Sequence, residues 1–156
     1  MPRERVEKLH QLLGTHGIEL IESLKARGEW LIQRLQDEMP HLSFGMGFHV
    51  VPSMLQVHLH VISLDFCAEA LRWPAHYNAF TTPFFMSPDT MIKVIRERGN
   101  FWLSKDELLY YREAKKVPLK CNQCNFLPGN EDMDILKEHL EEHLKRRATA
   151  VNYDKQ

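Results

Sequence analysis

Residues 56–63 read Gln56-Val57-His58-Leu59-His60-Val61-Ile62-Ser63, and polar and apolar side chains alternate along the first six of them. Successive side chains of a β-strand point to opposite faces, so this period of two predicts a strand with one polar and one apolar face. The alternate residues beginning with Val57 would face a core. The polar face would carry Gln56, His58 and His60.

The residues before this strand predict a second strand, a turn and two helices. Residues 44–51 are rich in glycine and aromatic residues, and Pro52-Ser53-Met54 then interrupts the run, as at a tight turn. Apolar residues recur at helical spacing over residues 4–38. Gly14 and Gly17 suggest a break between two helices in that region.

The residues after the strand predict a long loop and a series of short elements. No clean period runs through residues 64–82, which favours a loop. Ser87 has the position of a helix N-cap before Pro88, and this helix would stop at Gly99. Residues 101–103 predict a short strand, and the capping-box spacing of residues 104–107 opens another helix. The predicted fold class is therefore α+β, with an antiparallel sheet.

The composition is that of one compact domain, with room for a small appended module. The chain has 156 residues, with 20 Lys plus Arg against 21 Asp plus Glu and a formal charge of −1. Binding to nucleic acid would therefore need a local basic patch. No apolar run is long enough to cross a bilayer and the first residues are polar, so we expect an intracellular soluble protein without a membrane partner.

Basic and aromatic residues in the second half of the chain allow two interpretations. Arg72 and the lysines and arginines at 115, 116, 120 and 145–147 could touch phosphates. Glutamates neighbour the last three, so a solvated helix end explains those three equally well. Phe101 and Trp102 could stack on exposed bases, although packing in the core is the favoured interpretation. Cys67 is most simply a buried apolar side chain.

The strongest chemical signal in the sequence is Cys121-x2-Cys124-x14-His139-x3-His143. A CxxC turn supplies two thiolates, and two histidines one helical turn apart supply two imidazoles from one face of a helix. An amphipathic helix over residues 132–147 would carry that pair. The alternative is a redox CxxC beside two unrelated histidines. Four protein ligands leave no open position, so the predicted Zn2+ is structural.

The polar face of the predicted strand 56–63 carries the second chemical signal. A neutral imidazole such as His58 can attack phosphorus, and a second one such as His60 can assist the departing oxygen. Ser53 and the backbone N–H groups after Pro52 could hold phosphate oxygens. The alternative is a half-exposed strand whose polar face happens to carry histidine.

Several motifs together resemble the aprataxin family of histidine triad proteins. Residues 48–54, 57–66 and 76–80 are similar to the triad region of that family, and the Cys2His2 finger completes the resemblance, which spans residues 9–144. It implies a partial histidine triad domain over residues 1–105, a zinc finger with its linker helix over 106–150, and a tail at 151–156.

The resemblance also implies an activity and its site residues. Aprataxins are hydrolases that remove AMP from adenylated 5′ ends left by abortive ligation, in the repair of DNA single-strand breaks. By this resemblance the partners are DNA with adenylated 5′ ends and AMP as product, and the protein is nuclear. His58 would form a histidine–AMP intermediate and His60 would assist, with phosphate held by His49, Ser53 and Gln56.

Three features depart from the family. Gln56 replaces the first histidine of the triad, and residues 71–75 lack the lysines usual there. Family members also carry a helix and strands before the helix that begins here, so we expect part of the sheet and of the adenosine-binding wall to be absent. The alternatives are a non-catalytic DNA-binding or interaction module, or hydrolysis of small nucleotide conjugates.

Overall fold

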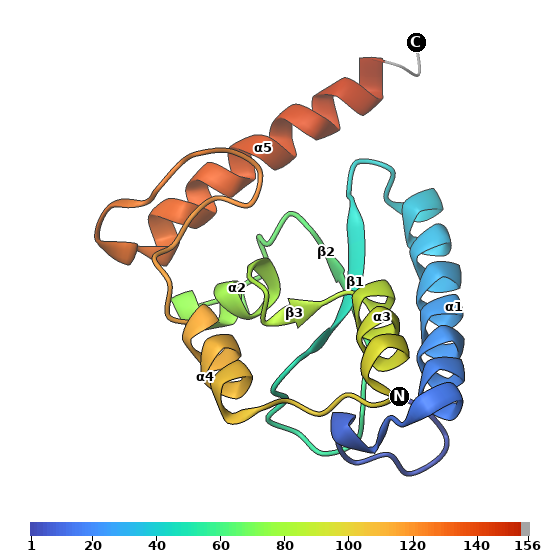
Figure 1. Ribbon diagram of the computed structural model, residues 1–156. Coiled ribbons are helices and arrows are strands. Elements are labelled where there is room, and N and C mark those ends of the chain that lie inside the picture. The colour runs from blue at the N-terminus through green and yellow to red at the C-terminus, as the bar shows by residue number, and fades with distance from the viewer. Residues whose placement is uncertain (154–156) are drawn as a thin grey trace.

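The computed structural model describes residues 1–153, which form a mixed helix and antiparallel-sheet fold with a helical C-terminal extension (Figure 1). The elements in chain order are η1 (Leu9–Gln11), α1 (Gly14–Glu38), β1 (Phe44–His49), β2 (His60–Ser63), α2 (Pro74–Thr81), β3 (Phe85–Met86), α3 (Pro88–Arg98), α4 (Lys105–Ala114), η2 (Gly129–Glu131) and α5 (Met133–Tyr153). The predicted α+β class is confirmed.

The sheet has the strand order β2-β1-β3, and both pairs are antiparallel. Gly47 of β1 lies opposite His60 of β2, and His49 of β1 lies opposite Phe85 of β3. A Cβ atom at Gly47 would lie 2.8 Å from both the carbonyl oxygen of Met86 and the ring of Phe85. Only glycine therefore lets β1 and β3 approach this closely beside the histidines.

Two large apolar clusters and a small third one around Phe84 hold the chain together. The first joins α1, α3 and the sheet, where α1 and α3 lie side by side (Figure 1). Its fully buried side chains include Ile21, Phe48, Met91 and Ile95. The second cluster joins α2 to α5, and its buried side chains include Tyr77, Leu119, Leu136 and Leu140. The C-terminal extension thus packs on the rest of the molecule through a core of its own.

The two predicted capped helices are confirmed. The Ser87 hydroxyl accepts from the backbone N–H of Thr90, and α3 ends at Gly99, whose φ is +76°. The Ser104 hydroxyl accepts from the N–H of Glu107, whose carboxylate accepts from the N–H of Ser104. Both helices start where their caps predicted because these signals are local.

The prediction of two N-terminal helices is wrong. Residues 4–7 are non-helical, since the backbone N–H groups of Gln56 and Val57 donate to the carbonyls of Glu7 and Val6 at 3.0 and 2.7 Å. Only the short η1 precedes α1, and Gly17 lies inside α1, packed on the backbone of Leu12. The first predicted helix does not form because residues 6 and 7 pair with residues 56 and 57.

Three further predictions need correction. The strand predicted over 56–63 begins only at His60, because residues 56 and 57 pair with the N-terminal segment instead. The loop predicted over 64–82 contains α2, since Pro74 occupies a first-turn position where proline is tolerated. Residues 101–103 are not a strand, and Phe101 is buried whereas Trp102 is exposed. Cys67 is half-buried.

The C-terminal helix is longer than predicted. The α5 helix continues beyond residue 147 to Tyr153, so it includes the start of the predicted tail 151–156. Residues 154–156 of that tail lie outside the described residues. Among the helices described over residues 1–153, none is long and apolar enough to cross a membrane.

Candidate functional site

The four predicted metal ligands come together in the structure. Cys121 and Cys124 lie in the segment before η2, and His139 and His143 lie one turn apart on α5. The four ligand atoms are within 4.8 Å of one another. The Nε2 atom of His139 is 3.1 Å from both the Cys124 Sγ and the His143 Nε2. Ligands around one Zn2+ lie roughly 3.3–3.8 Å apart, so the cluster suits zinc.

The segment between the cysteines and α5 closes around this cluster. The backbone N–H of Cys121 donates to the Phe126 carbonyl at 3.0 Å, and the N–H of Gln123 points at the Cys121 Sγ at 3.3 Å. The Phe126 ring stacks on the His139 ring at a centroid distance of 4.0 Å. These contacts fix the position of Cys121 and orient one of the imidazoles.

Hydrogen bonds tie this finger to the rest of the chain. The buried Tyr77 hydroxyl donates to the Lys120 carbonyl and accepts from the Asn122 backbone N–H, both at 2.9 Å. The buried Asn78 amide donates to the Val117 carbonyl at 2.7 Å. These two residues of α2 were not among the predicted site residues, because neither carries a metal-binding or catalytic group. Both residues are buried polar side chains on α2. The sequence did not predict this helix, so it gave no sign of their burial.

Three predicted site histidines form a second cluster. His49 on β1 and His60 on β2 have ring centroids 4.3 Å apart, and the His58 ring lies 4.7 Å from that of His60. Phe80, Phe84 and Phe85 surround them, each with its centroid within about 4.8–6.2 Å of a histidine ring. Strand pairing and this aromatic wall hold the three imidazoles together.

The tautomer of His58 follows from one contact. Its Nδ1 lies 2.8 Å from the backbone carbonyl oxygen of Gln56. A carbonyl oxygen can only accept, so the proton resides on Nδ1 and the lone pair on Nε2. The Nε2 atom of His58 is thereby prepared to act as a nucleophile or a base.

Burial keeps the other two imidazoles neutral. Burial lowers the pKa of His49 to about 4, and the neighbouring His60, His58 and Lys115 contribute to the same direction. The pKa of His60 is also lowered, first by burial and then by His58. The Nε2 atoms of both are buried and have no hydrogen-bond partner among the described residues. At neutral pH the Nε2 atom of each imidazole therefore still has a hydrogen bond to make.

The remaining two predicted site residues lie in the connection between β1 and β2. Ser53 is exposed in the turn that follows Pro52. The Gln56 side-chain amide donates to the Glu4 carbonyl at 2.8 Å, so it anchors the N-terminal segment. Gln56 contacts the histidine cluster through its backbone carbonyl, which meets His58.

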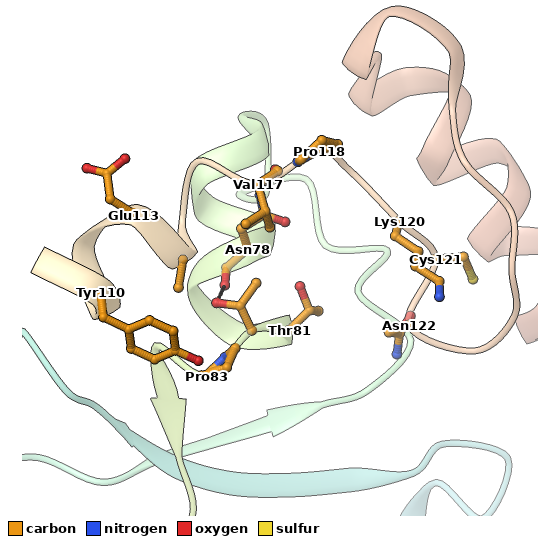
Figure 2. Close-up of a pocket in the computed structure, with 12 residues that line it drawn as sticks. Asn78, Thr81, Pro83, Tyr110, Glu113, Val117, Pro118, Lys120, Cys121 and Asn122 are labelled. Atoms are coloured by element: carbon orange, nitrogen blue, oxygen red, sulfur yellow. Dashed lines mark hydrogen bonds between the residues drawn. The ribbon is translucent and has the colours of Figure 1, made fainter. Parts of the chain in front are cut away.

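Two cavities accompany the clusters. One of about 480 Å³ lies between α2, α4 and the segment leading to Cys121, with Asn78, Tyr110 and Lys120 in its lining (Figure 2). None of the three clustered histidines lines this first cavity. The other, of about 420 Å³, borders Ser53 and Trp102. The sequence predicted neither cavity, because each is formed by segments that are far apart in the chain.

Three of the six basic residues considered near the finger pair with glutamates. Lys145 and Arg146 pair with Glu141 and Glu142 at 3.7 and 3.8 Å, and Lys116 pairs with Glu113. Arg147 instead donates to the side chains of Gln123 and Ser43. The end of α5 is thus a solvated, internally paired surface, which is the second of the two interpretations of this cluster.

Two family models match the chain. Residues 1–73 match the family described as scavenger mRNA decapping enzyme C-term binding. Residues 81–146 match the C2HE / C2H2 / C2HC zinc-binding finger. The second match contains all four residues of the Cys2His2 cluster, which supports zinc binding there.

Individual relatives agree with these matches. The chain is 34% identical to aprataxin of Gallus gallus over 92% of its own length and 43% of the relative, and 33% identical to aprataxin of Danio rerio over 92% and 42%. The chain thus spans about two fifths of the length of these curated relatives. A crystal structure of the aprataxin ortholog Hnt3 in complex with DNA is similar at a TM-score of 0.69 and 26% identity, over 94% of this chain and 73% of that one. The chain is therefore a homologue of the aprataxins that combines a histidine-triad-like fold with a Cys2His2-type finger.

Proposed function

We propose that this chain binds DNA and hydrolyses the 5′-adenylate left by an abortive ligation, releasing AMP and a ligatable 5′-phosphate. The observation that carries this proposal is the contact between His58 Nδ1 and the Gln56 carbonyl, which leaves Nε2 as a free nucleophile beside two neutral imidazoles. The similarity to Hnt3, a protein crystallised with DNA, supports DNA as the partner.

The first step of the proposed reaction forms a phosphorus–nitrogen bond. The Nε2 lone pair of His58 attacks the AMP phosphorus, and the bond from that phosphorus to the oxygen of the DNA 5′-phosphate breaks. That oxygen leaves with the bonding electron pair, and the N–H of neutral His60 can donate to it. The His58 ring becomes cationic while it carries AMP, and the Gln56 carbonyl stabilises this charge through the Nδ1–H.

The second step returns the enzyme to its starting state. Water adds to the phosphorus, the phosphorus–nitrogen bond breaks, and the electron pair returns to His58 Nε2. The lone pair of neutral His60 can accept the proton that the water loses, and His60 then releases this proton to solvent and is neutral again. In both steps His49 and the turn at Ser53 would hold phosphate oxygens, with Gln56 fixing the position of this turn through its contact with Glu4.

Zinc would have a structural role in this protein. Cys121, Cys124, His139 and His143 together supply four ligands, which is a complete tetrahedral set. The metal would hold the CxxC turn against α5. It would thereby stabilise the segment that leads to Cys121, which Tyr77 and Asn78 join to the triad domain through hydrogen bonds. By the same proposal the protein works in DNA single-strand break repair in the nucleus.

The test is release of AMP from a nicked duplex bearing a 5′-adenylate. Zinc-loaded wild-type protein and His76→Ala, which changes an exposed histidine on α2, should both release AMP. His58→Ala should release none and form no covalent AMP adduct, with its zinc content unchanged. Release at the wild-type rate by His58→Ala would refute the assignment of the nucleophile.

A second candidate is a non-catalytic DNA-binding module. The observation that favours it is Gln56, whose side chain engages Glu4 and cannot titrate as a histidine would. In that case wild type and His58→Ala would bind the nicked duplex equally well and neither would release AMP. Hydrolysis of adenosine phosphoramidate without any dependence on DNA would instead indicate a small-nucleotide hydrolase.

A further inference from the structure

A cavity of about 420 Å³, here called the Trp102 cavity, lies beside the turn that carries Ser53. Four segments that are distant in sequence line it: residues 7–10, residues 50–55, residues 101–103, and α4 through Leu108 and Arg112. Its volume is in the range typical of small-ligand sites. The proposed reaction at the histidines uses only the edge of this space that Ser53 lines.

The feature that distinguishes the cavity is an exposed tryptophan. Trp102 is 63% exposed although its neighbour Phe101 is 2% exposed. The backbone N–H of Trp102 donates to the Asn100 side chain at 2.9 Å, and the ring of His10 meets the indole edge-on at 5.5 Å. The indole is therefore held in a defined place while much of its surface stays open. An aromatic face presented in this way is what an unstacked nucleobase packs against.

The charged side chains around the cavity favour an anion. Lys8 and Arg112 line it and form no salt bridge with any described carboxylate. Glu7 also lines the cavity, but its carboxylate pairs with Arg5. Two uncompensated cations beside an aromatic ring match the two parts of a nucleotide, its phosphate and its base.

The cavity adjoins a small hollow beside the histidine cluster. Leu9 and Pro52 line both the cavity and this hollow, which His49 and His58 also line. A ligand in the Trp102 cavity would therefore lie next to a phosphate held at the histidines. The cavity has room for a single nucleotide, and an unpaired base has both faces free to stack on the indole.

We propose that the Trp102 cavity binds one unpaired nucleotide of the DNA strand adjoining the 5′ end, with its base stacked on Trp102 and its phosphate near Arg112 and Lys8. This inference rests on the proposed function, since it extends the path of the same DNA strand. It makes the protein selective for 5′ ends whose terminal nucleotide is out of the duplex.

The experiment compares two nicked duplexes that carry a 5′-phosphate. In one the terminal nucleotide is unpaired, and in the other it is an abasic residue of the same backbone. Wild-type protein, measured by fluorescence anisotropy, should bind the first roughly tenfold more tightly. Trp102→Ala should lose this preference and Trp102→Phe should retain most of it. The matched control is Trp73→Ala, since Trp73 is 64% exposed and lies outside the cavity.

A second pair of variants tests the charged part of the cavity. Arg112→Gln should weaken binding of both duplexes and flatten the salt dependence of the affinity. The control is Arg96→Gln, because Arg96 is exposed on α3 and does not line the cavity. Equal salt dependence in these two variants would contradict a phosphate at Arg112.

The outcomes separate this inference from the function on which it rests. If Trp102→Ala behaves like Trp73→Ala while wild type binds the DNA and releases AMP, the subsite is wrong and the proposed function stands. If Trp102→Ala weakens both duplexes equally, Trp102 does not stack on the base and the subsite is again wrong. If wild type binds neither duplex, the proposed function fails and the subsite fails with it.

Discussion

The Nδ1 atom of His58 lies 2.8 Å from the backbone carbonyl oxygen of Gln56. This contact uses a main-chain atom, so it does not depend on which side chain occupies position 56. The glutamine side chain at position 56 therefore has no part in setting the tautomer of His58. What position 56 must supply is a particular backbone conformation, since its φ is +70°.

That φ leads to a prediction about stability. Non-glycine residues in this left-handed region cost roughly 1–2 kcal/mol, whereas glycine occupies it readily. Gln56→Gly and Gln56→Ala both remove the amide that donates to Glu4. The glycine variant should be more stable than the alanine variant, because it avoids the cost of the left-handed conformation. The difference should be about 1 kcal/mol, since the flexibility of glycine in the unfolded chain offsets part of that gain. Urea unfolding measures this difference, and equal stabilities would show that position 56 is unstrained.

The sequence predicted the elements whose signals are local. Ser87 and Ser104 marked helix starts because a cap is recognised by residues within one turn of it. The Cys2His2 set was likewise recognisable from spacing alone. The predicted site histidines also came together, since β1 and β2 follow one another in the chain and pair in the sheet.

The elements that were missed depend on distant partners. Residues 56 and 57 alternate like a strand but pair with Val6 and Glu7 in a non-helical segment, and no local pattern reveals that pairing. The opposite exposures of Phe101 and Trp102 arise because the backbone N–H of Phe101 donates to Leu12, near the start of α1. The Trp102 cavity was unpredictable for the same reason.

The close packing at Gly47 predicts a large effect of a single methyl group. In Gly47→Ala the new Cβ would lie 2.8 Å from the Met86 carbonyl oxygen, a backbone atom that cannot turn away. Overpacking of this kind costs about 1–3 kcal/mol. Gly45→Ala is the matched control, because its Cβ would meet the flexible end of Leu64 at 3.0 Å. Chemical unfolding of both variants should show the greater loss at Gly47, and equal losses would contradict the close contact with β3.

Burial of His49 predicts that stability falls in acid. Its pKa is about 4 in the folded protein and 6.5 in the unfolded chain, so the unfolded chain binds more protons below pH 6.5. This contribution is complete above pH 6.5 and is lost as the pH falls toward 4. It amounts to on the order of 2 kcal/mol, given that the ring is only half-buried.

The check is the slope of the free energy of unfolding against pH, measured between pH 6.5 and 4. His49→Gln should flatten this slope, and the slope that remains should include the contribution of His60, whose pKa is lowered in the same direction. His76→Gln replaces an exposed histidine on α2 and controls for the loss of any one histidine. A slope as steep in His49→Gln as in wild type would show that His49 does not remain neutral.

The Tyr77 hydroxyl links the triad domain to the metal-binding turn. It donates to the Lys120 carbonyl and accepts from the Asn122 N–H, and these two residues flank Cys121. Tyr77→Phe would remove the partner of a part-buried carbonyl and a part-buried N–H, which costs about 1 kcal/mol. Because both orphaned groups adjoin a zinc ligand, this variant should release zinc to a chelator faster than wild type and unfold at lower urea. Tyr110→Phe removes the hydroxyl of an exposed tyrosine and should change neither property. Equal rates of zinc release in the two variants would mean that the finger holds its metal without support from α2.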